Sequence, residues 1–339
     1  MSEMLAMIAT KPRARLQMER RALPEPGSRE VRIRVHACGV CHSDSMMIEG
    51  RMPGLAYPRI PGHEVIGTIE ALGQEVRGWR IGERVGVGWF SGACGYCVNC
   101  RHGNAFACQN IPGATGLTRD GGYATHMVAL ESALAHVPQE LDAVQSAPLL
   151  CAGITTFNAL RHSGAHPGDL VAIHGVGGLG HLGIQFAARQ GFRTVAINRG
   201  RDKESLAQSL GAVGYIDSEK QDPAAALREL GGAKAILATV TNPDAMQAVV
   251  GGLGVNGTML VIGAVGAFAV DTLELLRKRA SLKGWYSGTA VDSEDTLLFS
   301  QRHKVVSMNE VYPLDQAQAA YERMMSGKAR FRVVLRMEG

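Results

Sequence analysis

The chain has 339 residues, of which 46% are hydrophobic and 19% are charged. This length and composition exclude general disorder, allow a sizeable buried core and favour two domains over one. The formal charge of +4 is small and its excess of basic residues is scattered, so we expect no nucleic-acid partner. No apolar run is long enough to cross a bilayer and the N-terminus lacks an apolar signal segment, so we expect a cytoplasmic protein without membrane contact.

Short β-strand patterns are frequent in the first 150 residues. Examples are residues 31–35 (VRIRV) and 65–72 (VIGTIEAL), and glycine-rich turns lie between such patterns. Alternating apolar residues bounded by turn residues are typical of strands in an antiparallel sheet. The first part of the chain is therefore predicted to be rich in β-structure.

Three residues of metal-ligand type are spread over this part of the chain. Cys41 lies in GVCHSD, His63 lies in PGHE, and Cys151 follows much later. Two cysteines and one histidine are the ligand set of a catalytic zinc that keeps its fourth position open. Spacing alone does not bring these three residues together, because a lone histidine is more often a satisfied polar residue than a ligand.

Four further cysteines lie close together in the run ACGYCVNCRHGNAFAC: Cys94, Cys97, Cys100 and Cys108. Four thiolates at this spacing can surround one tetrahedral zinc ion and leave no open position, which describes a structural site. An iron–sulfur cluster is the competing interpretation, since thiolates also bind such clusters. Disulfides are a poor alternative in a long chain without a signal peptide. The spacing favours structural zinc.

A strand, a glycine-rich turn and a helix follow one another after residue 168. Residues 169–174 (DLVAIH) predict a buried strand, and residues 181–191 predict a helix that ends at a glycine. The turn between them consists of Gly175, Val176, Gly177, Gly178, Leu179 and Gly180. Glycines in this context allow a tight turn, a close approach to a pyrophosphate and close packing of helix on strand. The phosphates would bind at the N-terminus of the helix.

Further strand patterns alternate with helical ones up to about residue 288. The strand patterns are 193–198 (RTVAIN), 233–240 (AKAILATV), 257–265 (GTMLVIGAV) and 281–287 (SLKGWYS). This alternation predicts an α/β domain with a doubly wound parallel sheet.

The second of these strands ends without the acidic residue that would bind the 2′-hydroxyl of NAD. Asn198 stands there, and Arg199, Arg201 and Lys203 follow. An amide does not repel a 2′-phosphate, and a guanidinium can bind one through two hydrogen bonds. We therefore expect NADP(H) to be favoured over NAD(H). The alternative is that the arginines are solvated loop charges and that Asn198 accommodates the ribose of NAD.

Taken together, GVCHSD, PGHE, the four-cysteine loop, PLLCAGITTFNAL (148–160) and GVGGLG resemble the zinc-dependent medium-chain alcohol dehydrogenases, of the shorter type found in yeast and bacteria. The resemblance extends over nearly the whole chain. It implies a GroES-like, β-rich catalytic domain over residues 1–153 and an inserted Rossmann domain over residues 154–288. Residues 289–339 would then return to the catalytic domain.

The resemblance implies two zinc ions per chain. Cys41, His63 and Cys151 match the ligands of the catalytic zinc, and Cys94, Cys97, Cys100 and Cys108 match those of the structural zinc. Asp44 matches a carboxylate that orients the ligand histidine. Glu64 matches a residue that can approach the catalytic zinc from behind during ligand exchange.

The same resemblance implies roles for three residues that contact substrate or cofactor. Ser43 matches the hydroxyl that takes the proton of the substrate alcohol, while His42 and Arg332 match residues that reach the cofactor pyrophosphate. A histidine that relays this proton to solvent in yeast-type enzymes is replaced by Met46. A separate route for the proton is therefore expected.

Two positions match residues that line the substrate pocket. Trp89 keeps the aromatic side chain of yeast-type enzymes, whereas Met52 replaces an expected tryptophan. Because methionine is narrower and more adaptable than an indole, we expect a pocket for longer aliphatic or aromatic primary alcohols and aldehydes.

The expected activity is thus reversible hydride transfer between a small-molecule alcohol and a nicotinamide cofactor. A secondary-alcohol or polyol dehydrogenase of the same superfamily is the alternative, although such enzymes commonly have glutamate where Cys151 stands. A zinc-ribbon binding module is the alternative outside enzymes, with only Arg101 and His102 in its favour. We expect a homo-oligomer, a tetramer or otherwise a dimer.

Overall fold

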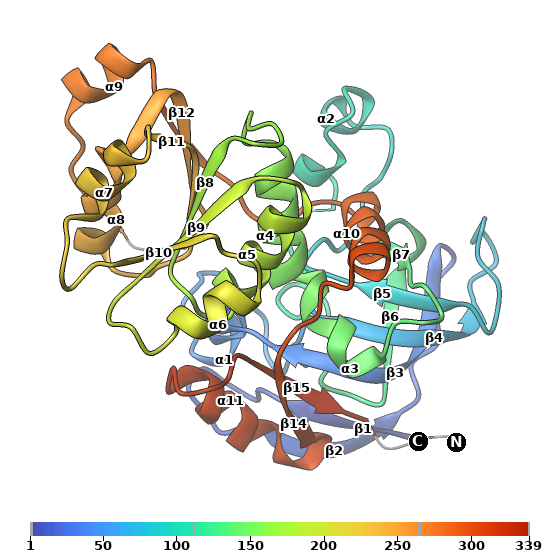
Figure 1. Cartoon of the computed structure of the whole chain (residues 1–339). Helices are drawn as coiled ribbons and strands as arrows, with labels where there is room; N and C mark the ends of the chain where they lie inside the picture. Colours follow the sequence, from blue (N-terminus) through green and yellow to red (C-terminus); the bar gives the residue numbers. More distant parts are fainter. Residues whose placement is uncertain (1–2, 112, 264–265, 338–339) are drawn as a thin grey trace. The chain divides into compact units, whose positions relative to one another are not determined.

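The computed structural model describes residues 3–111, 113–263 and 266–337. The chain forms two compact units. One, here called the outer unit, combines Met1–Cys151 with Ser287–Gly339, and the other, the inserted unit, is Ala152–Tyr286. The boundaries expected from the sequence were 153/154 and 288/289. Figure 1 shows the course of the chain through both units.

The inserted unit is built on six parallel strands in the spatial order β10-β9-β8-β11-β12-β13. The strands are β8 (Leu170–His174), β9 (Arg193–Asn198), β10 (Gly214–Asp217), β11 (Ala233–Ala238), β12 (Leu253–Val261) and β13 (Ser281–Gly284). The predicted doubly wound parallel sheet is therefore confirmed. The strand order reverses between β8 and β11, and ligands bind at such a switch point in open α/β sheets.

Helices cover both faces of this sheet (Figure 1). They are α4 (Ala152–Arg161), α5 (Gly180–Arg189), α6 (Glu204–Ser209), α7 (Pro223–Glu229), α8 (Pro243–Val250) and α9 (Thr272–Lys278). Helices α4 and α5 pack on each other and on the central strands, and α7 and α8 pack on each other and on β12. Asp222 and Asn242 cap α7 and α8 through their side chains, and a proline follows each cap.

The strand ends differ from the prediction at several places. Residues 193–198 form a strand as predicted, but β11 stops at Ala238, and the N–H and the hydroxyl of Thr239 then both donate to the carbonyl of His174, at 2.9 and 2.8 Å. Strand β12 begins earlier than predicted and ends at Val261, and residues 264–265 lie outside the described residues. Strand β13 stops at Gly284, and β10 was not predicted.

The outer unit is built on a seven-stranded sheet with the path β14-β15-β3-β4-β5-β7, and β6 also pairs with β3. The bounds are β3 (Glu30–Val40), β4 (Val65–Leu72), β5 (Arg84–Val87), β6 (His126–Leu130), β7 (Leu134–His136), β14 (Asn309–Pro313) and β15 (Arg332–Arg336). Strands β1 (Glu3–Ile8) and β2 (Gln17–Ala22) form a separate antiparallel pair. In β3, Val31, Ile33 and Val35 are buried, in agreement with the predicted alternation.

Short helices connect these strands. The α-helices are α1 (Ser45–Ile48), α2 (Val98–Arg101), α3 (Ala143–Ser146), α10 (Ala290–His303) and α11 (Ala317–Met325), and the 3₁₀-helices are η1 (His42–Asp44), η2 (Ala105–Ala107), η3 (Glu131–Ala133), η4 (Ala147–Leu150) and η5 (Leu314–Gln316). Helix α11 packs on β15, β14 and β3, and α10 packs on β7 and η4. Buried side chains of β1, β3, β4 and β15 share one hydrophobic core.

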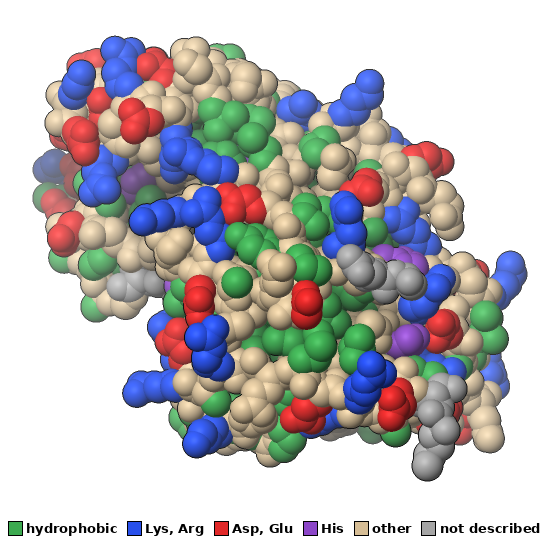
Figure 2. Space-filling model, turned by 90° about the horizontal axis from the view of Figure 1, so that it is seen from below, with side chains coloured by type: hydrophobic (Ala, Val, Ile, Leu, Met, Phe, Trp, Pro, Cys, Tyr) green, Lys and Arg blue, Asp and Glu red, His purple; other side chains and the backbone are tan. Residues whose placement is uncertain are grey.

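The surface carries charges of both signs. On the face seen in Figure 2, the Lys and Arg side chains are interspersed with Asp and Glu side chains. Across the described residues, no helix combines the length and the apolar character that crossing a membrane requires.

Candidate active site

Four metal-ligand side chains meet in the outer unit. The thiols of Cys41 and Cys151, the ring of His63 and the carboxylate of Glu64 each offer one ligand atom, and these atoms all lie within 4.8 Å of one another. The two sulfur atoms are 3.7 Å apart. Residues that are far apart in the sequence thus come together as the resemblance implied.

Three separate segments bring these side chains together. Cys41 follows the end of β3 and caps the 3₁₀-helix η1, where its sulfur accepts the N–H of Ser43. His63 and Glu64 lie immediately before β4, which pairs with β3 along its length. Cys151 follows η4, another short helix of the outer unit. The site therefore rests on the central strands of the sheet.

Asp44 fixes the orientation of the His63 ring. Its Oδ1 lies 2.9 Å from Nδ1 of His63, and both side chains are buried. Because a carboxylate only accepts, Nδ1 carries the proton and Nε2 keeps a lone pair. Nε2 is buried, and within the described part of the chain it has no hydrogen-bond partner. A buried nitrogen in this state needs a partner, and a metal ion would supply it.

The electrostatics of the site favour one thiolate. Contact with Cys151 and then with His63 holds the pKa of the Cys41 thiol well below its usual range, despite its burial. Contact with Cys41 together with burial raises the pKa of Cys151. Burial lowers the pKa of the His63 imidazole, whereas Asp44 and Cys41 act in the opposite direction. Such interdependence is expected of titratable side chains packed in contact with one another.

The donor set fits zinc. Two thiolates and one imidazole are the ligands of a catalytic zinc site that retains an open position. A carboxylate that orients the ligand histidine is the usual second layer of such a site. The orphaned Nε2 of His63 and the closely spaced sulfurs of Cys41 and Cys151 are what this group requires.

Glu64 and Arg332 form a buried ion pair next to these ligands. One oxygen of Glu64 accepts a hydrogen bond from Arg332, whereas the other, Oε2, has no partner within the described residues. Burial raises the pKa of Glu64, and the charge of Arg332 opposes this shift. The carboxylate packs on β3 at Gly39, where a Cβ atom would lie 1.8 Å from Oε2. Arg332, expected to reach a pyrophosphate, thus also neutralises Glu64.

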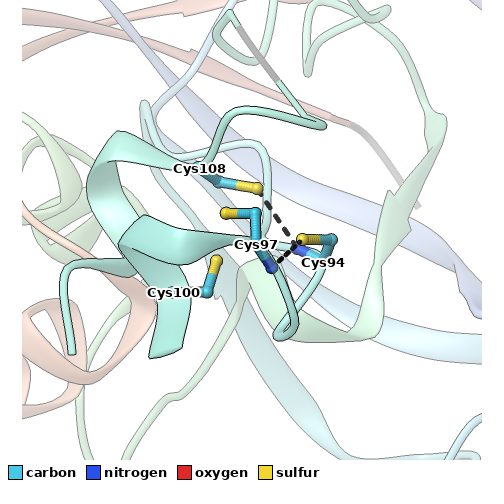
Figure 3. A group of neighbouring side chains, drawn as sticks. All are labelled: Cys94, Cys97, Cys100 and Cys108. Atoms are coloured by element: carbon cyan, nitrogen blue, oxygen red, sulfur yellow. Dashed lines mark hydrogen bonds between the residues drawn. The ribbon is translucent and has the colours of Figure 1, made fainter. Parts of the chain in front are cut away.

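The four cysteines of the loop converge as their spacing predicted. Figure 3 shows the side chains of Cys94, Cys97, Cys100 and Cys108 grouped at the start of α2 and beside the following turn. Their sulfur atoms lie within 4.8 Å of one another. Backbone N–H groups of Cys94 and Cys97 donate to the sulfurs of Cys108 and Cys94, at 3.3 and 3.4 Å. This arrangement fits a closed tetrahedral ion.

Backbone hydrogen bonds prepare this loop for negative charge. N–H groups of neighbouring residues, first that of Cys100, lower the pKa of Cys97 to about 6. Desolvation, followed by hydrogen bonds with the neighbouring cysteine side chains, raises the pKa of Cys100 to about 12. All seven cysteines lie among the described residues and none forms a disulfide. Cys38 is buried in the core beside the first site.

The glycine-rich turn of the inserted unit has the shape of a dinucleotide cradle. Gly175 has a φ of +98°, which favours glycine. A Cβ atom on Gly180 would lie 1.7 Å from the carbonyl oxygen of Gly175, so helix α5 approaches the turn closely. A Cβ atom on Gly177 would meet nothing within 4 Å, which leaves its backbone open to a ligand. Gly178 and Leu179 complete the turn before α5.

Two side chains at and after the end of β9 hold this turn. Oδ1 of Asn198 accepts the N–H of Val176 at 3.2 Å, and Nζ of Lys203 donates to the carbonyl of Val176 at 2.6 Å. Arg201 binds Glu204 through two contacts, at 2.7 and 3.0 Å. Arg199 has an 84% exposed side chain and lies 3.6 Å from Glu219. The basic loop is therefore tied to the turn by Asn198 and Lys203.

The other expected site residues differ in how close they lie to the metal ligands and in how exposed they are. Trp89 contacts His63 edge to face, with ring centroids 4.9 Å apart. Ser43 lies in η1 directly after Cys41, and His42 is exposed at the start of this helix. Met52 is 42% exposed in the segment between α1 and β4. His42 and Arg332 belong to the outer unit, and the glycine turn belongs to the inserted unit.

Sequence reasoning missed one residue of the site. Tyr123 is fully buried, and its hydroxyl donates to Oδ2 of Asp44 at 2.9 Å. The only local signal was an aromatic residue after two glycines, Gly121 and Gly122, and such a pattern carries no specific chemistry.

Comparison with known proteins agrees with the fold. Residues 27–139 match the alcohol dehydrogenase GroES-like domain, and residues 178–300 match the zinc-binding dehydrogenase family. The chain is 43% identical over 324 residues to the alcohol dehydrogenase patD of Penicillium expansum, with 96% of this chain and 95% of that protein covered. It is 35% identical over 342 residues to the aldehyde reductase YahK of Escherichia coli strain K12, with 97% and 96% covered.

A solved structure supports the same conclusion. The thermostable alcohol dehydrogenase from Pyrobaculum aerophilum, determined with cobalt and zinc bound, superposes with a TM-score of 0.87 at 26% identity. The superposition covers 99% of this chain and 100% of the Pyrobaculum aerophilum chain. A GroES-like domain is thus combined with a Rossmann-type domain over the full length. The chain belongs to the zinc-dependent medium-chain alcohol dehydrogenases and is an oxidoreductase.

Proposed function

We propose that this enzyme binds two zinc ions per chain and interconverts primary alcohols and aldehydes with NADP(H) as the preferred cofactor. The observation that carries the proposal is the buried cluster of Cys41, His63 and Cys151, in which Nε2 of His63 has no partner within the described residues. This nitrogen and the two thiols would be the ligands of a catalytic zinc ion. The four cysteines of the loop would be the ligands of a structural zinc ion.

The chain's own residues position the reactants. A zinc ion held by Cys41, His63 and Cys151 would supply Lewis-acid chemistry that lowers the pKa of a substrate hydroxyl. The nicotinamide supplies the hydride acceptor or donor. Asp44 keeps the ring of His63 in one tautomer through a 2.9 Å hydrogen bond. Ser43, two residues after Cys41 in η1, takes the proton of the alcohol.

The proton leaves Ser43 without a histidine at position 46. Met46 stands there and has no group that can transfer a proton. The exposed His42 is the nearest histidine in the sequence. The rate of alcohol oxidation should therefore lack the pH dependence that a proton-relaying histidine gives in yeast-type enzymes.

The preference for NADP(H) rests on the residues after β9. Asn198 brings no negative charge that would repel a 2′-phosphate, and the exposed side chain of Arg199 lies 3.6 Å from Glu219. Arg201 is more fully engaged by Glu204. Arg199 and Lys203 are therefore the cations that we assign to the 2′-phosphate.

The substrate class follows from the residues near the metal ligands. Trp89 presents an aromatic ring against His63, which gives the site an apolar wall. Met52 replaces a bulkier tryptophan, so longer aliphatic or aromatic substrates are favoured over ethanol. The aldehyde reductase name of the Escherichia coli relative supports the reductive direction for this chain.

We also propose a cytoplasmic homo-oligomer, a tetramer or otherwise a dimer. The tetramer rests on the resemblance, since the chain lacks the extra segment that longer dimeric members carry near residue 120. Strand β13 ends the path of the inserted sheet and is short, and its residues are exposed or half-buried.

The test is a panel of alcohols and aldehydes assayed with both cofactors. Ethanol, hexanol, benzyl alcohol and the matching aldehydes are each assayed with the NAD and NADP forms. A higher kcat/KM for hexanol or benzyl alcohol than for ethanol, together with a preference for NADP(H), is expected. Equal or better use of ethanol would contradict the pocket assignment, and a strong preference for NAD(H) would contradict the cofactor assignment.

A further inference from the structure

A buried tyrosine lies one hydrogen bond beyond the metal-ligand histidine. The hydroxyl of Tyr123 donates to Oδ2 of Asp44 at 2.9 Å, and Oδ1 of the same carboxylate accepts from Nδ1 of His63 at 2.9 Å. All three side chains are at most 1% exposed. They form a continuous chain of hydrogen bonds that ends at the orphaned Nε2 of His63.

The carboxylate of Asp44 accepts three hydrogen bonds in this network. Besides Tyr123 and His63, the backbone N–H of Cys41 donates to Oδ2 at 2.8 Å. The N–H of Cys41 ties Oδ2 of the carboxylate to the start of η1, and the ring of His63 binds Oδ1. The hydroxyl of Tyr123 supplies a second point on Oδ2, and two points define the direction in which Oδ1 faces the imidazole.

The backbone around Tyr123 is itself fixed against the segment that carries His63. The N–H groups of Gly121, Gly122 and Tyr123 donate to the carbonyls of Ile60, Gly62 and Pro61, at 2.8, 3.1 and 3.0 Å. Residues 121–123 thus form a tight cover over residues 60–62.

Close packing places the ring of Tyr123 as well. A Cβ atom on Gly62 would lie 2.4 Å from Cδ1 of Tyr123, so the ring lies directly on the backbone next to His63. A Cβ atom on Gly122 would lie 2.2 Å from Cγ2 of Val65, which brings the cover close to the start of β4. The hydroxyl is therefore held at a defined place relative to both Asp44 and His63.

We propose that Tyr123 is a positioning residue of the catalytic metal site, whose hydroxyl locks Asp44 in the orientation that directs Nε2 of His63 at the metal. The proposal rests on the proposed zinc site. Removal of the hydroxyl leaves Asp44 bonded to Cys41 and His63, but Oδ2 then keeps one donor instead of two and the carboxylate is held less firmly. Groups that support metal-bound histidines typically change metal affinity 10–100-fold when they are lost.

The test compares Tyr123→Phe with Tyr321→Phe. Tyr321 is the matched control, because it is also buried, its hydroxyl also donates to a carboxylate, that of Glu49 at 2.7 Å, and it lies in the same unit. Cobalt replaces zinc at the site of Cys41, His63 and Cys151, and its transfer to a chelator is followed by visible absorption. Tyr123→Phe should release cobalt about tenfold faster than the wild type, and Tyr321→Phe should release it at the wild-type rate.

A double-mutant cycle with Asp44→Asn separates a role of Tyr123 in positioning Asp44 from a role in packing alone. If Tyr123 acts through Asp44, then adding Tyr123→Phe to Asp44→Asn should cause no further acceleration of metal release. Equal release rates for Tyr123→Phe and Tyr321→Phe, or additive effects in the cycle, would overturn the proposal. A wild-type protein that binds no metal at Cys41 would instead overturn the proposed function, so the two failures are distinguishable.

A second measurement does not require the hydroxyl to be removed. Fluorotyrosine incorporated at position 123 keeps the size and the hydrogen bond of the side chain. Its ¹⁹F resonance should shift when the catalytic metal is removed, and a label at position 321 should not. No shift at position 123 would overturn the proposal.

Discussion

Arg332 and Glu64 form an ion pair that is buried in the outer unit, 268 residues apart in the sequence. Glu64 lies next to the metal-ligand His63 and Arg332 lies at the start of β15, so the pair joins the ligand segment to the last strand of the chain. The pair thereby ties the C-terminal return of the chain to the active site.

Loss of one partner of this pair should destabilise the outer unit. Arg332→Met leaves a buried carboxylate without its cation, and such changes cost about 3–5 kcal/mol. Arg336→Met is the matched control, because Arg336 lies on the same strand and is exposed. Urea unfolding should show the loss only for Arg332→Met, and Glu64→Gln added to it should restore part of the stability. Equal stabilities of the two arginine variants would contradict this role.

The four-cysteine loop should contribute folding energy through its ion. Cys97→Ser removes one of four thiolates from a closed site, so zinc content should fall from two to one per chain and the thermal midpoint should fall with it. Cys38→Ala is the control for zinc content, which should stay at two per chain, because Cys38 belongs to neither group of ligand side chains. The assignment fails if Cys97→Ser keeps both zinc ions at unchanged stability.

The cofactor preference should depend on the charge at the end of β9. In Asn198→Asp the side chain can still accept the N–H of Val176, but it gains a charge that repels a 2′-phosphate. The ratio of kcat/KM for NADP(H) over NAD(H) should fall at least tenfold, or about 1.4 kcal/mol. Arg199→Ala should lower the same ratio, and Arg201→Ala should change it less because Arg201 already pairs with Glu204. An unchanged ratio in Asn198→Asp would contradict the assignment.

His174 should make the inserted unit sensitive to acid. It lies at the end of β8, where burial lowers its pKa to about 4. As the pH falls below the unfolded value of about 6.5, the unfolded chain gains a proton that the folded chain does not, so stability is lost, by about 2 kcal/mol at pH 5. His174→Gln should lose less stability than the wild type between pH 7 and pH 5, and exposed His166→Gln should lose as much. The same loss of stability in all three proteins would show that His174 is not the source of the acid sensitivity.

Local patterns predicted the parts of the site that lie close together in the sequence. The four cysteines and the turn from Gly175 to Gly180 are each fixed by spacing within one segment, and the structure arranges both as their spacing predicted. Cys41 and Cys151 are 110 residues apart, and their pairing was implied only by resemblance to a family.

Contacts between segments far apart in the sequence could not be predicted from local sequence patterns. Tyr123 and Asp44 are 79 residues apart, and no periodicity or motif indicates that a hydroxyl from one segment reaches a carboxylate of another. The ends of strands also differ from the prediction. Strand β11 ends at Ala238, and β12 runs from Leu253 to Val261 through Asn256, whose φ is +56°. Propensity alone does not encode these tertiary effects.

The zinc content and turnover of Cys41→Ser test the central claim most directly. Metal analysis of the purified wild-type chain should give two zinc ions per chain together with alcohol oxidation. Cys41→Ser should retain only the zinc of the four-cysteine loop, with turnover at least about a hundredfold lower. A Cys41→Ser protein with two zinc ions and the wild-type rate would contradict the account.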